Sequence, residues 1–256
     1  MTAPTAHVVS DAFFRFAANP GAVQFTDAIE ALEAMTAGRP VHGCLGDPEI
    51  RLRPGQGLNE AEVAALVDRA RAAGIAERLE GFGPKDRPLK APPRLTHKTR
   101  PENILISWPR KLADDLYESD LMLDSDSELM RDHVTGQHIQ GMVLIEAARQ
   151  TFLAVTEAHY MPADMSGAHY FVIESMAAHY KGFVFPVDAT IRYAVDRADM
   201  EPGRLSFDVS MTVHQGGQSR AELPTSFTAY DKSMLVPKEE RRAQRTLETL
   251  GAPREA

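Results

Sequence analysis

The sequence has little cysteine, no long apolar run and no excess of positive charge, and each shortage excludes a class of protein. Cys44 is the single cysteine in 256 residues, which excludes an intramolecular disulfide framework and a cysteine-based zinc site. No stretch approaches the roughly 20 apolar residues of a membrane-spanning helix. The 28 Lys and Arg against 36 Asp and Glu give a net charge of −8, the wrong sign for a surface that attracts nucleic acid or anionic lipid. We therefore expect no nucleic-acid partner and no membrane partner.

Targeting and metal-binding patterns are also scarce. The N-terminal sequence MTAPTAHVVSDAFFRF lacks the basic segment followed by an apolar segment that marks a secretory signal. The histidines show no metal-ligand spacing such as His-x-x-x-His. We therefore expect a cytoplasmic protein without a metal or cofactor. What is present is a globular composition, with 43% hydrophobic and 25% charged residues, which can bury a sizeable core.

Residues 1–90 are predicted to form a helical and irregular N-terminal extension. Apolar residues recur at helical spacing in the segment 26–35 and again in EAEVAALVDRARAAG, which follows the helix-capping residue Asn59. Between these two helices the chain is rich in Gly and Pro, which predicts a loop.

A proline-rich segment, GFGPKDRPLKAPPR at 81–94, ends this extension. Proline has no backbone N–H and restricts the residue before it, so the segment is predicted to be a linker. We therefore predict a second domain over residues 95–232 and a charged C-terminal tail over residues 233–256, which we expect to form a surface helix.

The second domain has the pattern of an antiparallel sheet interrupted by one helix. In the segment 188–196, Ile191 and Tyr193 fall on the apolar face and Arg192 on the polar face, as in a half-buried strand. A long apolar helix is predicted from about 142 to 159. We expect an α+β fold of the hotdog type, in which one antiparallel sheet wraps around a central helix. Strands are predicted at 103–107, 116–123, 169–175, 188–196, 204–214 and 219–230, with Gly216-Gly217 as the turn between the last two.

The segment RDHVTGQHIQGMVLIEAARQ, residues 131–150, holds the side chains best suited to chemistry. His133 and His138 lie in a glycine-containing loop. Gly141 and Met142 open the helix, and their backbone N–H groups are suited to polarising a carbonyl oxygen or holding an anion.

Glu146 lies about one turn into this helix among apolar neighbours. A buried carboxylate requires either a raised pKa or a cationic partner, and Arg149 lies three residues further on the same face. Such a pair keeps Glu146 ionised, which weakens it as a proton donor and favours a base or an anion-binding pair.

The same segment resembles the hotdog 3-hydroxyacyl-thioester dehydratases, whose motif runs His-Phe-Pro-Gly, Pro-Gly-Val-Leu, then Glu-Ala and a Gln four residues after the Glu. In that family the His is the base and an acidic residue of the partner subunit is the acid. This chain departs from the motif: Thr135 and Gln140 replace the two prolines, Arg149 replaces a small residue, and one residue fewer separates the His from the Glu. The matching residues are His133, Gly136, Gly141, Glu146 and Gln150.

The chain is more similar to the A-factor biosynthesis (AfsA-type) hotdog family, over residues 95–232. The matching elements are Thr96-His97-Lys98, the short strand Glu102-Asn103-Ile104-Leu105-Ile106, and the Glu-x-x-Arg-Gln element Glu146, Arg149 and Gln150. Members commonly carry two hotdog repeats, whereas this chain shows one. The resemblance therefore implies a homodimer, in which the partner supplies the second half of the active unit.

The resemblance implies an acyltransferase that joins a β-ketoacyl thioester to dihydroxyacetone phosphate in γ-butyrolactone or secondary-metabolite biosynthesis. The thioester would be carried by acyl carrier protein or coenzyme A. His133 or Glu146 would remove a proton, either from the attacking hydroxyl or from the α-carbon of the ketoacyl group, and Arg149 would orient the phosphate. The substrate contacts are expected from His138, Gly141, Met142 and Gln150, and carrier-protein docking from Arg100, Arg110 and Lys111.

Two other functions remain open at the level of sequence. One is a dehydratase or thioesterase on the same fold. The other is a non-catalytic module that binds an acyl chain or an acyl carrier protein, with residues 1–90 recognising the partner, since a hotdog fold does not determine function.

Overall fold

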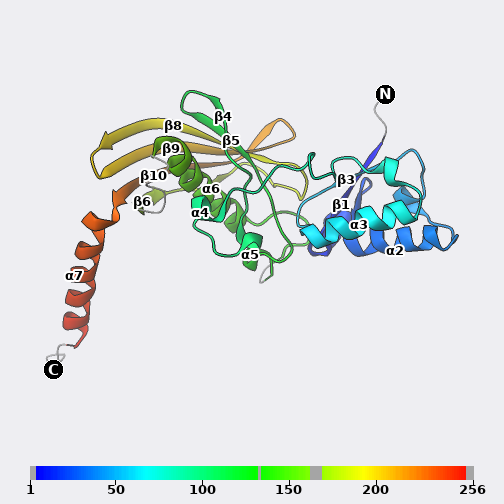
Figure 1. The fold of residues 1–256 in the computed structure, drawn as a ribbon, viewed down its shortest axis with the longest axis horizontal. Coiled ribbons are helices and arrows are strands. Elements are labelled where there is room, and N and C mark those ends of the chain that lie inside the picture. The colour runs from blue at the N-terminus through cyan, green and yellow to red at the C-terminus, as the bar shows by residue number, and fades with distance from the viewer. Residues whose placement is uncertain (1–3, 132–133, 162–168, 252–256) are drawn as a thin grey trace.

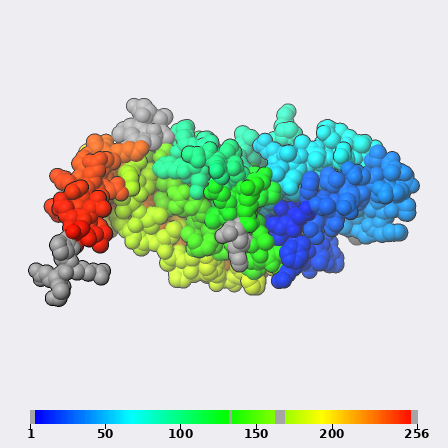
Figure 2. All heavy atoms as spheres, turned by 90° about the horizontal axis from the view of Figure 1, so that it is seen from below, coloured from blue at the N-terminus to red at the C-terminus, as the bar shows by residue number. Residues whose placement is uncertain are grey.

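The computed structural model describes residues 4–131, 134–161 and 169–251. The molecule is elongated, with an N-terminal unit at one end, an antiparallel sheet with its helix in the middle, and a projecting C-terminal helix at the other end (Figure 1). The same order of parts is visible from below in Figure 2. The expected α+β fold, with a helix-containing N-terminal region before a sheet around one helix, is confirmed.

The N-terminal unit is built on a small parallel sheet with strand order β2-β1-β3. Both predicted helices are present, and Asn59 caps the second through a reciprocal capping box with Glu62. The sheet was not predicted, because strands of 3 to 5 residues are too short to show an alternating pattern. The strands are β1 (Thr5–Val9), β2 (Ala22–Gln24) and β3 (Arg51–Pro54), and the helices are α1 (Phe14–Ala17), α2 (Phe25–Thr36) and α3 (Glu60–Ala72).

The central sheet is antiparallel with strand order β4-β5-β8-β9-β10-β6, and β7 also pairs with β10. Gly216 and Gly217 have φ angles of 60° and 74° and turn the chain between β9 and β10, as predicted. The strands are β4 (Arg110–Ala113), β5 (Leu116–Asp120), β6 (His169–Met176), β7 (His179–Tyr180), β8 (Thr190–Glu201), β9 (Arg204–Gln215) and β10 (Gln218–Asp231).

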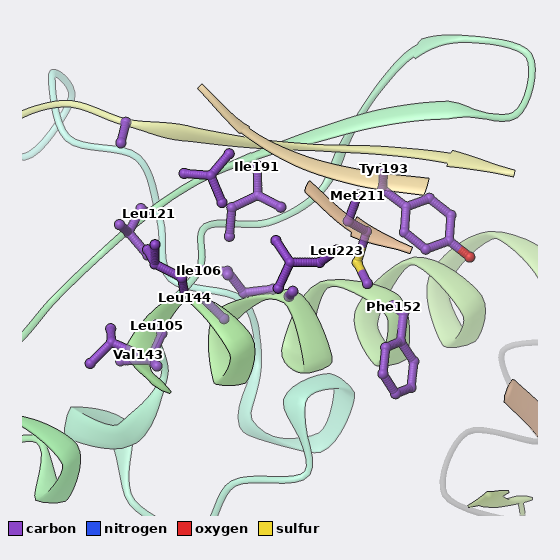
Figure 3. Packing of buried hydrophobic residues seen from close by; sticks show 14 of the residues in the cluster. Leu105, Ile106, Leu121, Val143, Leu144, Phe152, Ile191, Tyr193, Met211 and Leu223 are labelled. Carbon is purple, nitrogen blue, oxygen red and sulfur yellow. The ribbon is translucent and has the colours of Figure 1, made fainter. Parts of the chain in front are cut away.

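Helix α6 (Gly141–Val155) lies along this sheet, and the predicted helix continues as a π-helical turn, Thr156–Tyr160. Its apolar side chains, including Leu144 and Phe152, belong to one buried cluster with those of the strands, including Ile191, Met211 and Leu223 (Figure 3). All five are at most 2% exposed, so burial of this helix stabilises the unit. Two short helices, α4 (Pro93–Thr96) and α5 (Glu128–Arg131), contact α6.

The strand predicted at 103–107 is wrong for most of its length. A 3-10 turn occupies Pro101–Asn103. Within the predicted strand, only Ile106 and Ser107 form β-bridges, each with a single residue. The side chain of Gln150 takes the place of a neighbouring strand here, because it accepts from the Leu105 N–H at 2.9 Å and donates to the Asn103 carbonyl at 2.9 Å.

The proline-rich segment 81–94 is irregular until α4, but it is packed rather than a free spacer. Phe82 is buried in the N-terminal core, and Ala91 is buried in the central core and donates its N–H to Ile106. The side chain of Gln56, just after β3, donates to the Leu121 carbonyl and accepts from the Leu123 N–H, both at 2.8 Å. The two units are therefore hydrogen-bonded to each other, and the proposed boundary between residues 90 and 95 stays a prediction.

Helix α7 (Lys232–Gly251) has no buried residue and projects from the end of β10 (Figure 1). Within the described ranges, none of the helices is both long enough and apolar enough to cross a membrane.

Candidate active site

Glu146 and Arg149 form a two-pronged ion pair on α6. Arg149 donates from Nε to Oε2 of Glu146 at 2.7 Å and from Nη2 to Oε1 at 2.9 Å. The predicted i, i+3 pairing is present, and bidentate geometry of this kind gives the strongest type of Arg–carboxylate contact.

Two further side chains complete the cluster, which we call the Glu146 cluster: Glu146, Arg149, Lys98 and Gln150. Lys98 Nζ lies 2.7 Å from Oε1 of Glu146, and Gln150 Nε2 donates to the same oxygen at 3.0 Å. Lys98 comes from the turn after α4, where its own N–H donates to the Pro93 carbonyl at 3.0 Å. A single carboxylate thus accepts from three residues.

These hydrogen bonds determine the charge of Glu146. Burial alone raises the pKa of this carboxyl, but the bonds from Arg149, Lys98 and Gln150 outweigh burial and lower the pKa to about 2. Glu146 is therefore ionised at neutral pH, and the cluster, with two cations and one anion, carries one net positive charge. The side chains of Glu146, Arg149 and Lys98 are 18%, 28% and 25% exposed, so the charge is half-buried but reachable. Such a site favours an anion.

Gln150 lies behind this cluster. It is fully buried, and its amide already bonds to Leu105, Asn103 and Glu146. Gln150 supports Glu146 from behind, and its predicted direct contact with the substrate stays a prediction.

The ring of Tyr180 packs against the start of α6. A Cβ placed on Gly141 would come within 2.5 Å of the Tyr180 hydroxyl, so glycine allows this ring to approach the helix end. Met142 is 60% exposed. The N–H groups of Gly141 and Met142 donate to no other residue of the described part, in keeping with their place in the first turn of a helix.

The loop before α6 is held by Thr135, which stands where the dehydratase motif has proline. Its hydroxyl accepts from the His138 N–H at 2.9 Å and donates to the His138 carbonyl at 2.6 Å. The His138 ring packs against Phe183, with centroids 4.5 Å apart, and makes no contact with the Glu146 cluster in the described residues. His133 lies outside the described residues.

A second hydrogen-bonded pair, between His97 and Glu157, lies in the π-helical turn that follows α6. The Nε2 atom of His97 is 2.6 Å from Oε1 of Glu157, whose side chain is fully buried. We missed Glu157 in the sequence because it falls near the predicted helix end. The available signal was its spacing, since eleven residues after Glu146 places it three turns along the same face. Lys98 was noticed as part of a motif, but local spacing alone could not pair it with Glu146.

The three residues expected to dock a carrier protein are already in ion pairs. Arg100 pairs with Glu128, Arg110 with Glu118 and Asp120, and Lys111 with Asp114. Their role in docking stays a prediction.

A cavity of about 920 Å³ lies between the N-terminal unit and the central sheet, lined by residues such as Leu58, Val67, Phe82 and Leu123. The Glu146 cluster does not line it. No group of three or more metal-ligating side chains occurs in the ranges that the structure covers.

With the sheet, its central helix and the Glu146 cluster described, comparison with known families is informative. Residues 83–231 match the AfsA family, described as the A-factor biosynthesis hotdog domain. The match covers more than half of the chain, so the protein belongs to this family, as its Glu-x-x-Arg-Gln element indicated. A comparison with curated proteins finds no match.

Solved structures resemble part of the chain. The dehydratase heterocomplex ApeI:P from Xenorhabdus doucetiae has 14% identity and a TM-score of 0.45, covering 59% of this chain and 97% of that one. A conserved protein from Pseudomonas aeruginosa has 20% identity and a TM-score of 0.35, covering 47% and 86%. A hypothetical thioesterase with coenzyme A from Streptococcus pneumoniae has 15% identity and a TM-score of 0.33, covering 48% and 84%.

Proposed function

We propose that the protein is an AfsA-type acyltransferase acting on acyl thioesters, joining a β-ketoacyl thioester to a small phosphorylated hydroxy-ketone such as dihydroxyacetone phosphate. The observation that supports this best is the half-buried Glu146 cluster with one net positive charge. It suits a substrate that carries phosphate, because Arg149 retains N–H donors beyond the two that bind Glu146.

The low pKa of Glu146 also bears on the alternatives. A dehydratase needs a carboxylic acid that donates a proton, and a carboxyl group with a pKa of about 2 holds no proton at neutral pH. The same low pKa makes Glu146 a weak base. Its role in this proposal is to hold Arg149 and Lys98 in place for the phosphate.

In the proposed reaction, the free hydroxyl of the phosphorylated substrate attacks the thioester carbonyl. A carbon–oxygen bond forms, the carbon–sulfur bond breaks, and the hydroxyl proton passes through a base to the leaving thiolate. The N–H groups of Gly141 and Met142 would bind another carbonyl oxygen or an anionic group of the substrate, at the start of α6. His138 would contact the substrate, and His133 remains a candidate base from the sequence.

The proposal includes a homodimer. β6 ends the sheet order and pairs with β10 on one side only, among the strands that the structure describes. An eight-residue edge strand offers unpaired backbone groups to a second copy. We expect light scattering after gel filtration to give twice the chain mass of 28.2 kDa.

Mass spectrometry of reaction mixtures tests the activity. The purified protein is given β-ketoacyl-coenzyme A or β-ketoacyl carrier protein of several chain lengths, with and without dihydroxyacetone phosphate. We expect a phosphorylated ester that Arg149→Met fails to form, while Arg69→Met, at an exposed ion pair with Glu33 on the N-terminal unit, forms it at the wild-type rate. Hydrolysis alone would indicate a thioesterase, and binding without turnover a non-catalytic module; either result would contradict the proposal.

A further inference from the structure

Two neighbouring residues reach along α6 to two different carboxylates. Lys98 contacts Glu146, and His97 contacts Glu157. These two carboxylates are eleven residues apart, which corresponds to about 16 Å along a helix and nearly the same face. The turn after α4 therefore contacts both the Glu146 cluster and the His97–Glu157 pair, on the same side of the helix.

His97 is a partner of the buried carboxylate of Glu157. Its side chain is 0% exposed, and a buried carboxylate stays ionised only with charged or hydrogen-bonding partners. It lies in the π-helical turn Thr156–Tyr160, a type of irregularity often found at functional sites.

The backbone and packing of His97 hold its ring in one orientation. Its φ and ψ of 54° and 39° are in the left-handed region, which costs energy for a residue with a Cβ. Phe171 packs edge-on against the imidazole, with centroids 5.5 Å apart. The side chain of His97 is nevertheless 34% exposed, and no partner of Nδ1 is found among the described residues. One ring nitrogen is thus held by a buried carboxylate while the other remains accessible.

We infer that His97 is the acid–base residue of the proposed acyl transfer and that Glu157 is its positioning residue. This inference rests on the proposed function. With Nε2–H donated to the Glu157 carboxylate, the Nδ1 lone pair is free to accept a proton. Arrangements in which a buried carboxylate fixes the tautomer of a catalytic histidine follow the same principle.

His97 takes the proton from the attacking hydroxyl as the carbon–oxygen bond forms. It returns that proton to the sulfur as the carbon–sulfur bond breaks, so the imidazole ends unchanged and no co-reactant is needed. Because His97 and Lys98 are adjacent, a substrate whose phosphate lies at Lys98 and Arg149 can extend its hydroxyl end toward His97. Glu146 cannot take this part, since three residues already donate to it.

The first test separates chemistry from structure with His97→Gln. The glutamine amide can donate to Glu157 as Nε2 does, so the hydrogen bond to Glu157 is kept while the base is lost. We expect kcat to fall 10²- to 10⁴-fold with little change in KM and in melting temperature. The control is His42→Gln, at an exposed histidine of the N-terminal unit, which should match the wild type.

The second test is chemical rescue. Glycine suits the left-handed backbone at position 97, so His97→Gly leaves room for added imidazole without backbone strain. We expect substituted imidazoles to restore activity in the order of their basicity, which a structural histidine would not produce.

The test for Glu157 is Glu157→Gln, which we expect to lower kcat about tenfold or more while leaving KM for both substrates unchanged. An active wild type with His97→Gln and His97→Gly equally active would overturn the role of His97 alone. A wild type that makes no product from any thioester would overturn the proposed function and, with it, this inference.

Discussion

The Glu146 carboxylate couples folding to pH, because its proton affinity differs between the folded and unfolded states. Burial raises its pKa, but the bonds from Arg149, Lys98 and Gln150 lower it from 4.5 to about 2. Between these values the unfolded chain binds more protons, so stability falls as the pH falls. The contribution is fully present above pH 4.5 and is lost as the pH approaches about 2.

This leads to a prediction for Glu146→Gln. The variant leaves Arg149 and Lys98 half-buried without their carboxylate, and we expect a loss of about 3 kcal/mol in the free energy of unfolding at pH 7. Between pH 4.5 and 2 its stability should vary less with pH than that of the wild type. Urea titrations at several pH values provide the measurement. Glu240→Gln, at an exposed position of α7, is the control, and an equal pH dependence in both variants would contradict the assignment.

Gly141 gives a second prediction at the scale of one residue. A methyl group there would meet the Tyr180 hydroxyl at 2.5 Å, so Gly141→Ala should destabilise the protein by about 1–2 kcal/mol through overpacking. In a Tyr180→Ala background the same change should cost nothing or stabilise, because alanine is a better helix former than glycine. Denaturant unfolding of the four proteins in this cycle measures the coupling, and additive effects would show that the ring does not press on Gly141.

The contacts that could be predicted at this scale are the local ones. Arg149 was paired with Glu146 because residues three apart on a helix are neighbours. Lys98 and His97 lie 48 and 60 residues from their partners in the chain, so only the fold brings these groups together. The motif in the sequence includes His97 and Lys98, but it does not indicate which carboxylates they contact.

At the scale of elements, Gln150 holds an irregular segment against α6. Its amide replaces the backbone bonds that a neighbouring strand would make with Asn103 and Leu105. The run Ile104–Ile106 was predicted as a strand because it is apolar. It does not pair as a strand because Gln150 takes up part of its backbone hydrogen bonding. The run is buried like a strand, with exposures of 0 to 2%, but a side chain satisfies part of its backbone.

We therefore predict a large effect for Gln150→Ala. The change leaves the Leu105 N–H and the Asn103 carbonyl without partners in a buried place, and we expect a loss of about 2–4 kcal/mol. Hydrogen exchange at the Leu105 amide should accelerate at least tenfold. Gln244→Ala, whose amide bonds only to Glu248 within α7, is the matched control. Unchanged exchange at Leu105 would show that another group holds this segment.

Helix α7 gives the opposite expectation. It buries no residue, so its removal deletes little of the packed interior. A chain ending at Asp231 should lose less than about 1 kcal/mol of unfolding free energy and keep the same cooperative transition. Thermal and urea unfolding of the truncated chain test this, and a loss of several kcal/mol would mean that the contacts of α7 with β6 and β10, or with a second copy, stabilise the fold.

At the scale of the whole molecule, the two units are more closely joined than the sequence indicated. The central core includes Val9 and Phe13, which come from the N-terminal region. Predicting this was not possible, since the parallel sheet has very short strands and the bonds from Gln56 to the central unit join residues 65 and 67 positions apart in the chain. By contrast, the long strands from β8 to β10 and their hairpin turn followed from alternation and from Gly216-Gly217.

The side chain of Gln56 carries the last prediction, because it bonds to the backbone of the central unit on both of its amide atoms. Gln56→Ala leaves the Leu121 carbonyl and the Leu123 N–H without these partners, and buried unpaired groups cost about 1–3 kcal/mol each. We expect a loss of about 2 kcal/mol overall and hydrogen exchange at Leu123 that accelerates at least tenfold more than exchange within α6, whose amides accelerate only by the loss of global stability. Gln218→Ala, at the exposed β9–β10 turn, should leave both quantities unchanged. If the Leu123 amide keeps its protection in Gln56→Ala, the two units are joined by packing alone and Gln56 does not couple them.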